Sequence, residues 1–107
     1  MSTRVKLTQR AMVQHLVVTP DAGGGEARNW ADFRYVWADV RWGGVGRDAE
    51  NGGVGLRQRA SVTVRWAPDF PDPMRLILAG KSLRVLAVMR EKIDAGDYLE
   101  LECEDTF

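Results

Sequence analysis

Two segments of the chain alternate between apolar and polar residues with a period of two. In the first, one parity holds Val36, Ala38, Val40 and Trp42, and the other holds Tyr35, Trp37, Asp39 and Arg41. In the second, which runs from Leu56 to Trp66, the apolar parity holds Leu56, Ala60, Val62, Val64 and Trp66, and the opposite parity holds Arg57, Arg59, Ser61, Thr63 and Arg65. Successive side chains of a β-strand point to opposite faces. The pattern therefore predicts two strands.

A glycine-rich stretch from Gly43 to Gly55 separates these two strands. Connections in compact domains usually take about 4–6 residues, and unstructured ones longer than ~12 are uncommon unless they are functional or disordered. The sequence therefore predicts a long loop that is either functional or disordered.

Four further strands are expected, at Arg10 to Thr19, Met74 to Ala79, Leu83 to Met89 and Tyr98 to Glu104. The stretch Asn29 to Phe33 fits either a short helical turn capped by Asn29 or a lead-in to the strand that follows it. Glycines and aspartates mark the turns, and Pro68, Pro71 and Pro73 interrupt the middle of the chain.

This pattern indicates an all-β fold of about six strands, in which short connections favour antiparallel pairing. A small antiparallel β-barrel or a compact sandwich would bury one face of each strand. The 107 residues are sufficient for a single domain over 1–107, with 1–9 and 105–107 as flexible tails.

Composition narrows the classes of partner. The 15 basic and 15 acidic residues cancel, so net charge does not indicate non-specific binding to nucleic acid or to a membrane surface. No apolar run approaches the ~20 residues of a membrane span, and we expect a cytoplasmic product. The single cysteine, Cys103, agrees with a reducing compartment.

Several chemical motifs are incomplete. Gly80, Lys81 and Ser82 resemble the end of a phosphate-binding loop, but Arg75 stands where its first glycine belongs, so a turn is the better interpretation. Asp48 and Glu50 lack the terminal acid of a calcium loop. His15 has no neighbouring ligand cluster, and no nucleophile elbow occurs. We therefore expect no enzyme, no cofactor and no metal.

Charged rows provide candidates for an interface. Glu100, Glu102 and Glu104 share one face of the last strand, and Arg57, Arg59 and Arg65 share one face of an earlier one. A solvated strand face explains the acidic row, and a contact between the acidic row of one copy and the arginine row of the next is the alternative. Head-to-tail contacts of this kind close into rings when the rotation permits.

The order of features resembles that of the head-tail joining (head-closure, or stopper) proteins of tailed bacteriophages. The resemblance runs from about Val5 onward: it depends on the Trp30 lead-in, the strand Val36-Trp37-Ala38-Asp39-Val40, the long loop, the strand Val62-Thr63-Val64-Arg65, Met74-Arg75-Leu76 before Gly80, the strand Leu83 to Val88, and the final Tyr98-Leu99-Glu100-Leu101-Glu102-Cys103.

This resemblance implies a small antiparallel β-barrel that forms a homo-oligomeric ring below a portal or adaptor. Such a ring closes the head filled with double-stranded DNA and provides the surface on which a tail terminator or tail tube protein docks. The protein would then reside in the neck of a virion or phage-like particle, such as a prophage or gene transfer agent particle, assembled in the bacterial cytoplasm. Its channel loop would comprise Gly43, Gly44, Gly46, Arg47, Asp48, Glu50, Gly52, Gly53 and Gly55, and its subunit contacts would involve Trp37, Arg57, Arg59, Arg65, Glu100 and Glu102.

Two other functions remain open. A small barrel of SH3 or OB type could bind peptides or nucleic acid through the face of Tyr35, Trp37 and Arg41. The second open function is that of a tail-terminator protein, which also forms a small ring.

Overall fold

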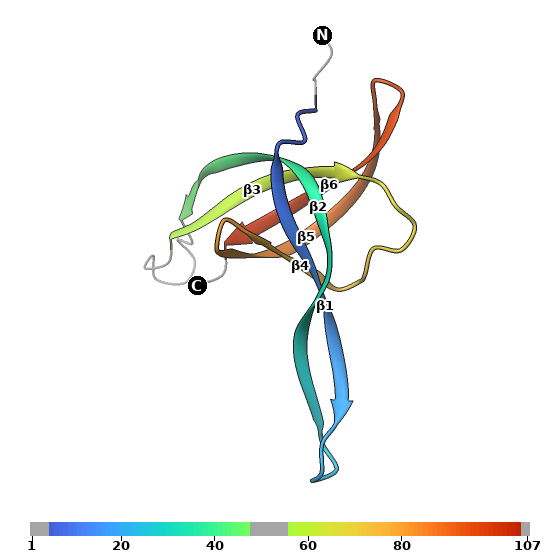
Figure 1. The fold of residues 1–107 in the computed structure, drawn as a ribbon. Helices are drawn as coiled ribbons and strands as arrows, with labels where there is room; N and C mark the ends of the chain where they lie inside the picture. The colour runs from blue at the N-terminus through green and yellow to red at the C-terminus, as the bar shows by residue number, and fades with distance from the viewer. Residues whose placement is uncertain (1–4, 48–55, 106–107) are drawn as a thin grey trace.

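The computed structural model describes residues 5–47 and 56–105, which form six strands. These are β1 (Gln9–Pro20), β2 (Glu26–Arg47), β3 (Leu56–Arg65), β4 (Met74–Leu78), β5 (Lys81–Ile93) and β6 (Gly96–Asp105). All neighbours pair antiparallel, and the sheet closes in the order β1-β2-β3-β6-β5-β4 (Figure 1). The predicted all-β class and antiparallel barrel are confirmed.

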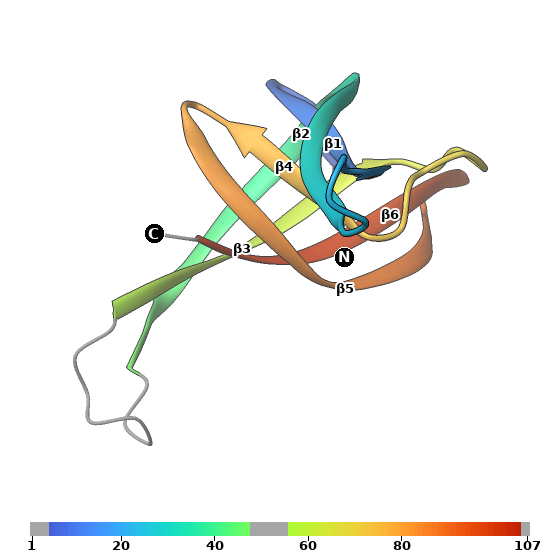
Figure 2. The ribbon, with the colours of Figure 1, turned by 90° about the horizontal axis from the view of Figure 1, so that it is seen from below.

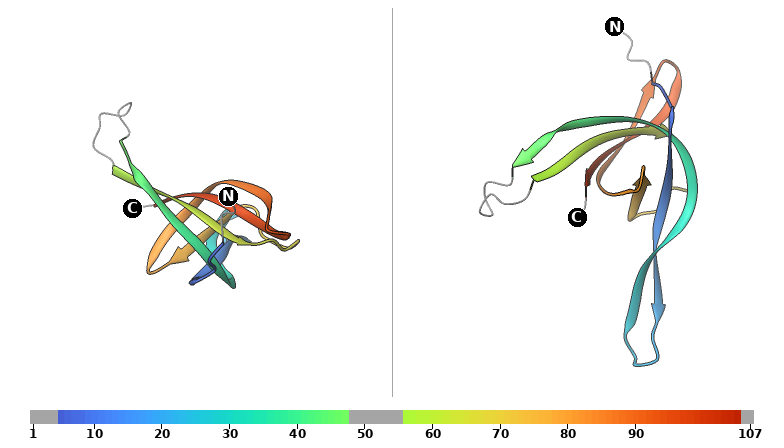
Figure 3. Two further views of the ribbon diagram at one scale, coloured as in Figure 1. Left: turned by 90° about the horizontal axis from the view of Figure 1, so that it is seen from above. Right: turned by 60° about the vertical axis from the view of Figure 1, so that its left-hand side comes forward.

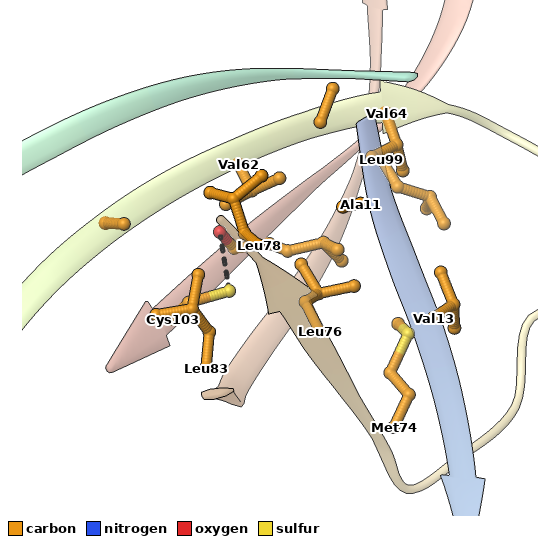
Figure 4. Packing of buried hydrophobic residues seen from close by; sticks show 13 residues of the cluster. Ala11, Val13, Val62, Val64, Met74, Leu76, Leu78, Leu83, Leu99 and Cys103 are labelled. Atoms are coloured by element: carbon orange, nitrogen blue, oxygen red, sulfur yellow. Dashed lines mark hydrogen bonds between the residues drawn. The ribbon is translucent and has the colours of Figure 1, made fainter. Parts of the chain in front are cut away.

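The core lies inside this barrel and is built from the apolar parities that the sequence indicated (Figure 4). Its largest fully buried side chains are Leu76, Leu83, Leu101, Val13, Val62, Val64 and Cys103. Burying an aliphatic side chain of this size contributes about 1.5–3 kcal/mol. The described chain places such side chains on five of the six strands, so the packing itself holds the barrel closed.

One hairpin extends well beyond the barrel. Pairing of β1 with β4 ends at His15, and pairing of β2 with β3 begins only at Ala38. Residues 16–30 therefore form a two-stranded ribbon, called the β1–β2 arm below, which projects away from the other strands (Figure 1). At its tip the Asp21 carboxylate accepts hydrogen bonds from the backbone N–H groups of Gly23 and Gly25, at 2.8 and 3.0 Å.

The arm corrects the sequence-based boundaries. The stretch Asn29 to Phe33 belongs to β2, so the alternative of a helical turn there is wrong. The left-handed φ of 85° at Gly24 explains the need for glycine at the tip, because side-chain-bearing residues rarely adopt that conformation.

β2 also continues past Trp42. It pairs with β3 as far as Arg47, with a shift of register between Trp42 and Val45. The first five residues of the predicted 43–55 loop are therefore strand, and residues 48–55 lie outside the described part of the chain. Figure 2 shows this end of the β2–β3 hairpin extending beyond the barrel.

β5 is longer than the predicted Leu83 to Met89, because its hairpin with β6 also runs beyond the barrel (Figure 3). Gly80 lies in the turn before β5 with a φ of 78°, and no helix follows it, so the turn interpretation is confirmed. Gln9 and Asp105, which the sequence placed in tails, are the first residue of β1 and the last of β6.

Candidate assembly surface

The acidic row and the arginine row lie side by side in one molecule. β3 and β6 are neighbours, and their register sets Arg59 opposite Glu104, Ser61 opposite Glu102 and Thr63 opposite Glu100. The Ser61 hydroxyl donates a hydrogen bond of 2.9 Å to Oε1 of Glu100. Arg59 and Arg65 therefore face the same side of the barrel as the acidic row, a relation that the sequence could not show because β3 and β6 are not consecutive.

The three acids of the row differ in environment. Glu104 is buried, with 7% of its surface exposed, and the register places it between Arg59 on β3 and Arg84 on β5. A carboxylate is buried at low cost only beside opposite charge or hydrogen-bond donors. Glu102 is exposed and Glu100 is half-buried. Glu100 and Glu102 therefore carry the charge that the row presents to solvent.

A hollow of about 440 Å³ borders this row and is also predominantly acidic. Its charged lining consists of four carboxylates and two cations: Asp39, Glu91, Asp94, Glu100, Arg41 and Lys92. Asp39 accepts a hydrogen bond from the backbone N–H of Lys6 at 3.1 Å and lies 3.8 Å from the Arg41 guanidinium. The hollow and the exposed acids, Glu100 and Glu102, are together called the acidic wall below.

A second surface covers the outer face of β1, β2 and β4. Its residues combine arginine, aromatic and aliphatic side chains, and they are called the basic–aromatic face: Arg10, Met12, Leu16, Val18, Arg28, Trp30, Tyr35, Trp37, Arg75 and Ile77. Gln14 and the exposed acid Asp32 share this face, and Nε2 of Gln14 donates a hydrogen bond of 2.8 Å to Oδ1 of Asp32. Tyr35 and Trp37 are 54% and 57% exposed. Aromatic residues and arginine are enriched at protein interfaces.

Contacts within the basic–aromatic face hold its side chains in place. The Arg10 guanidinium lies 3.9 Å from the centre of the Tyr35 ring, and that of Arg75 lies 5.1 Å from the Trp30 ring. Nε of Arg75 also donates to Oε1 of Gln14 at 2.6 Å. The sequence identified Trp37 and Tyr35 but missed the face as a whole, because it combines β4 with two strands far from it in the chain.

An apolar hollow of about 510 Å³ adjoins Tyr35 and Trp37. It is lined mainly by Leu7, Val36, Trp66, Ala67 and Phe70, together with Arg34 and Arg65. Arg34 forms an ion pair with Asp69 at 3.1 Å and lies 5.1 Å from the Phe70 ring centre. The predicted interface residues Trp37 and Arg65 therefore border one depression.

Comparison with known proteins agrees with this architecture. The chain matches the family model "Phage head completion protein" over residues 3–106. The chain belongs to the phage head completion protein family. A chain in the structure of the virion of a native gene transfer agent particle is 25% identical to this head completion protein, with a TM-score of 0.76, and the match covers 96% of this chain and 98% of that one.

A second solved structure shows the fold alone: the solution structure of protein SF1141 from Shigella flexneri 2a is 23% identical, with a TM-score of 0.65 and 92% coverage of each chain. The search of curated proteins gave no match. The predicted resemblance to phage head-tail joining proteins is confirmed at the level of the family. This head completion protein is a structural component of a phage or gene transfer agent virion.

Chemically reactive groups of the head completion protein have packing roles. Cys103 is 1% exposed, and its thiol donates to the carbonyl oxygen of Leu101 at 3.7 Å (Figure 4). Burial, and to a smaller extent the charge of Glu102, raises the pKa of the Cys103 thiol to about 12. The thiol therefore stays protonated and unreactive at neutral pH. The His15 ring packs edge-on against the Phe33 ring, with 5.6 Å between the two ring centres.

The described residues hold no group of three or more histidine, cysteine or acidic side chains that could bind a metal. Among those same residues, no helix is long and apolar enough to span a membrane. Of the predicted channel loop, Gly43, Gly44, Gly46 and Arg47 lie in β2, and Asp48, Glu50, Gly52, Gly53 and Gly55 lie outside the described residues. Its place in a DNA channel stays a prediction. Arg57 lies in β3.

Proposed function

We propose that this protein assembles as a ring below the portal or its adaptor, closes the DNA-filled head and offers the docking surface for a tail. The observation that carries the proposal is the family match over residues 3–106, nearly the whole chain. The likeness to a chain in a gene transfer agent virion supports it. The mechanism requires no chemistry from the protein, because a rigid barrel that touches its neighbours can block a channel by its volume.

The barrel suits such a role because several of its surfaces project or remain uncovered. The β1–β2 arm and the ends of the β2–β3 and β5–β6 hairpins extend in different directions (Figure 3). Each could reach a different neighbour: another copy, the portal or adaptor, or a tail protein. The packaged double-stranded DNA would pass through the ring or be held behind it.

The two alternative functions fit less well. A binding module for nucleic acid needs aromatic rings open to stacking bases. In this protein, the Arg10 guanidinium covers the Tyr35 ring and that of Arg75 lies over the Trp30 ring, which leaves Trp37, 57% exposed, as the open ring of this face. The match to the head completion family supports a role on the head side of the neck over that of a tail-terminator ring.

Deletion of the gene tests this proposal. We expect DNA-filled heads without tails, or heads that have lost their DNA, in electron micrographs of the resulting particles. Expression of the wild-type chain from a plasmid should restore tailed particles. Normal numbers of tailed, DNA-filled particles in the deletion strain would refute the proposed function.

A further inference from the structure

The exposed acids of the acidic wall and the centre of the basic–aromatic face lie on opposite sides of the barrel, and the two surfaces meet on β2, between Trp37 and Asp39. In the closed order β1-β2-β3-β6-β5-β4, β6 is three strands away from β1 in either direction. The exposed acids of the acidic wall are on β6, and the basic–aromatic face is centred on β1. In a ring of many copies, each subunit uses two different surfaces on nearly opposite sides of its body.

The arginines of the basic–aromatic face lack carboxylate partners within the described residues. Ion pairs form elsewhere, between Arg34 and Asp69, Arg41 and Asp39, Lys81 and Asp105, and Arg90 and Asp97. Arg10, Arg28 and Arg75 form none of these. Arg10 and Arg28 are exposed, and Arg75 is oriented by its hydrogen bond to Gln14.

The apolar side chains between these arginines are also uncovered. On this face Val18 is 46% exposed, and Tyr35 and Trp37 are more than half exposed. The acidic wall has an apolar border of its own, since Leu86 and Met89 on β5 are 42% and 53% exposed, and the register sets Met89 beside Glu100. Each surface therefore combines apolar area with charge: arginines outnumber the single acid Asp32 on the basic–aromatic face, and carboxylates outnumber Arg41 and Lys92 on the acidic wall.

We infer that the basic–aromatic face of one copy docks on the acidic wall of the next, with Arg10 directed toward Glu100 and Glu102 and Arg28, which lies about 26 Å further along the β1–β2 ribbon, directed toward the carboxylates of the hollow. This inference rests on the proposed ring and specifies its subunit contact. A second copy is the fitting occupant because the chain carries both complementary surfaces on opposite walls, while its 15 basic and 15 acidic residues cancel overall. Complementary potentials select partners and fix their register.

This contact differs from the one that the sequence suggested. There, the arginines opposite the acidic row were Arg57, Arg59 and Arg65 of another copy. In the structure, β3 adjoins β6, so Arg59 and Arg65 belong to the same side of the barrel as the acids. A neighbour that met the acids would meet these arginines as well, and Arg59 already lies opposite Glu104.

Charge reversal with rescue tests the contact in assembled particles. Three variants would replace the wild-type gene: Glu100→Arg/Glu102→Arg, Arg10→Glu/Arg28→Glu, and the combination of all four changes. The amount of the protein per purified particle is measured against the portal protein, and the melting temperature of each purified variant confirms folding. We expect each pair to lower incorporation about tenfold or more, and the combination, which re-creates the Arg10 contact with reversed charges, to raise incorporation above that of the worse pair.

A matched control is Asp72→Lys, a reversal of an exposed residue in the segment before β4 that belongs to neither surface. Under the proposed contact it leaves incorporation unchanged. A second pair, Glu100→Gln/Glu102→Gln, keeps the shape of the side chains and is expected to lower incorporation at an unchanged melting temperature. It tests the contact even where the reversed acids impair folding.

Incorporation that stays at the wild-type level in both reversed pairs, or a combination no better than the worse pair, would overturn the inferred contact. Such particles would still contain the protein and leave the proposed function intact. A wild-type protein that is absent from particles would instead refute the proposed function itself.

Discussion

Replacement of Leu101 by alanine is expected to lower the free energy of unfolding by about 2–5 kcal/mol. Leu101 is fully buried on β6, where the register places it between Val62 on β3 and Val88 on β5. Truncation removes favourable burial and leaves a cavity that the surrounding β-barrel can fill only in part. Because the free energy of unfolding of small domains is only about 5–15 kcal/mol, this substitution would remove a large share of the protein's stability.

Urea unfolding followed by tryptophan fluorescence would measure this loss. The matched control is Leu86→Ala, which removes the same atoms from a side chain that is 42% exposed on β5. We expect its cost to stay below about 1 kcal/mol, since exposed positions away from special features tolerate substitution. A loss below about 1 kcal/mol for Leu101→Ala would contradict the assignment of Leu101 to the barrel core.

Shortening of the β1–β2 arm is expected to leave the barrel stable but to reduce incorporation into particles about tenfold or more. In this variant an Asn-Gly turn replaces residues 17–29, so that Leu16 and Trp30, which already pair, flank a two-residue hairpin loop. None of the buried core residues lies within residues 17–29. The melting temperature should therefore change little.

We expect assembly to be impaired because an isolated ribbon such as the arm gains stability only when it packs against another protein. A two-stranded ribbon is marginally stable alone in water, and open strand edges invite unwanted pairing. In the described chain, residues 16–20 of β1 and residues 26–30 of β2 pair with each other and with no third strand. The arm also carries Arg28 and Val18 of the basic–aromatic face.

Thr19→Ala is the control for the shortened arm. Thr19 is exposed on β1, and its parity places it on the opposite face of the arm from Val18. It should leave both the melting temperature and the incorporation unchanged. Full incorporation of the shortened chain would show that the arm makes no contact needed for assembly.

The sequence predicted the barrel well where strands bury one face. β3 and β6 show strict alternation because Val62, Val64, Leu99 and Leu101 point into the core while their neighbours face solvent. A period of two arises from this contrast in burial. Both strands were therefore placed to within a residue or two of their observed bounds.

The sequence failed where strands run past the barrel. Residues 26–32 of β2 lie in or beside the β1–β2 arm, where both faces are exposed or half-exposed, so no alternation marks them as strand. The same reason hid the end of β5 beyond Met89. Gly43 and Gly44 looked like loop because glycine disfavours strands, and they do form the irregularity between Trp42 and Val45, after which β2 resumes its pairing with β3.

The candidate surface was predictable only in its parts. The acidic row follows from the parity of Glu100 and Glu102, and the exposure of Trp37 follows from the parity of β2. Which row lies beside which depends on barrel closure, and this joins β3 to β6 and β1 to β4. Neither pairing links consecutive strands, so only the structure reveals that Arg75 supplements the face of Arg10.

Reconstruction of the particle neck by electron microscopy tests the central claim most directly. We predict that the six-stranded barrel repeats around the channel between portal and tail, with β6 of each copy facing β1 and β4 of the next. A neck without this barrel, or the barrel bound elsewhere on the particle, would contradict the proposed role.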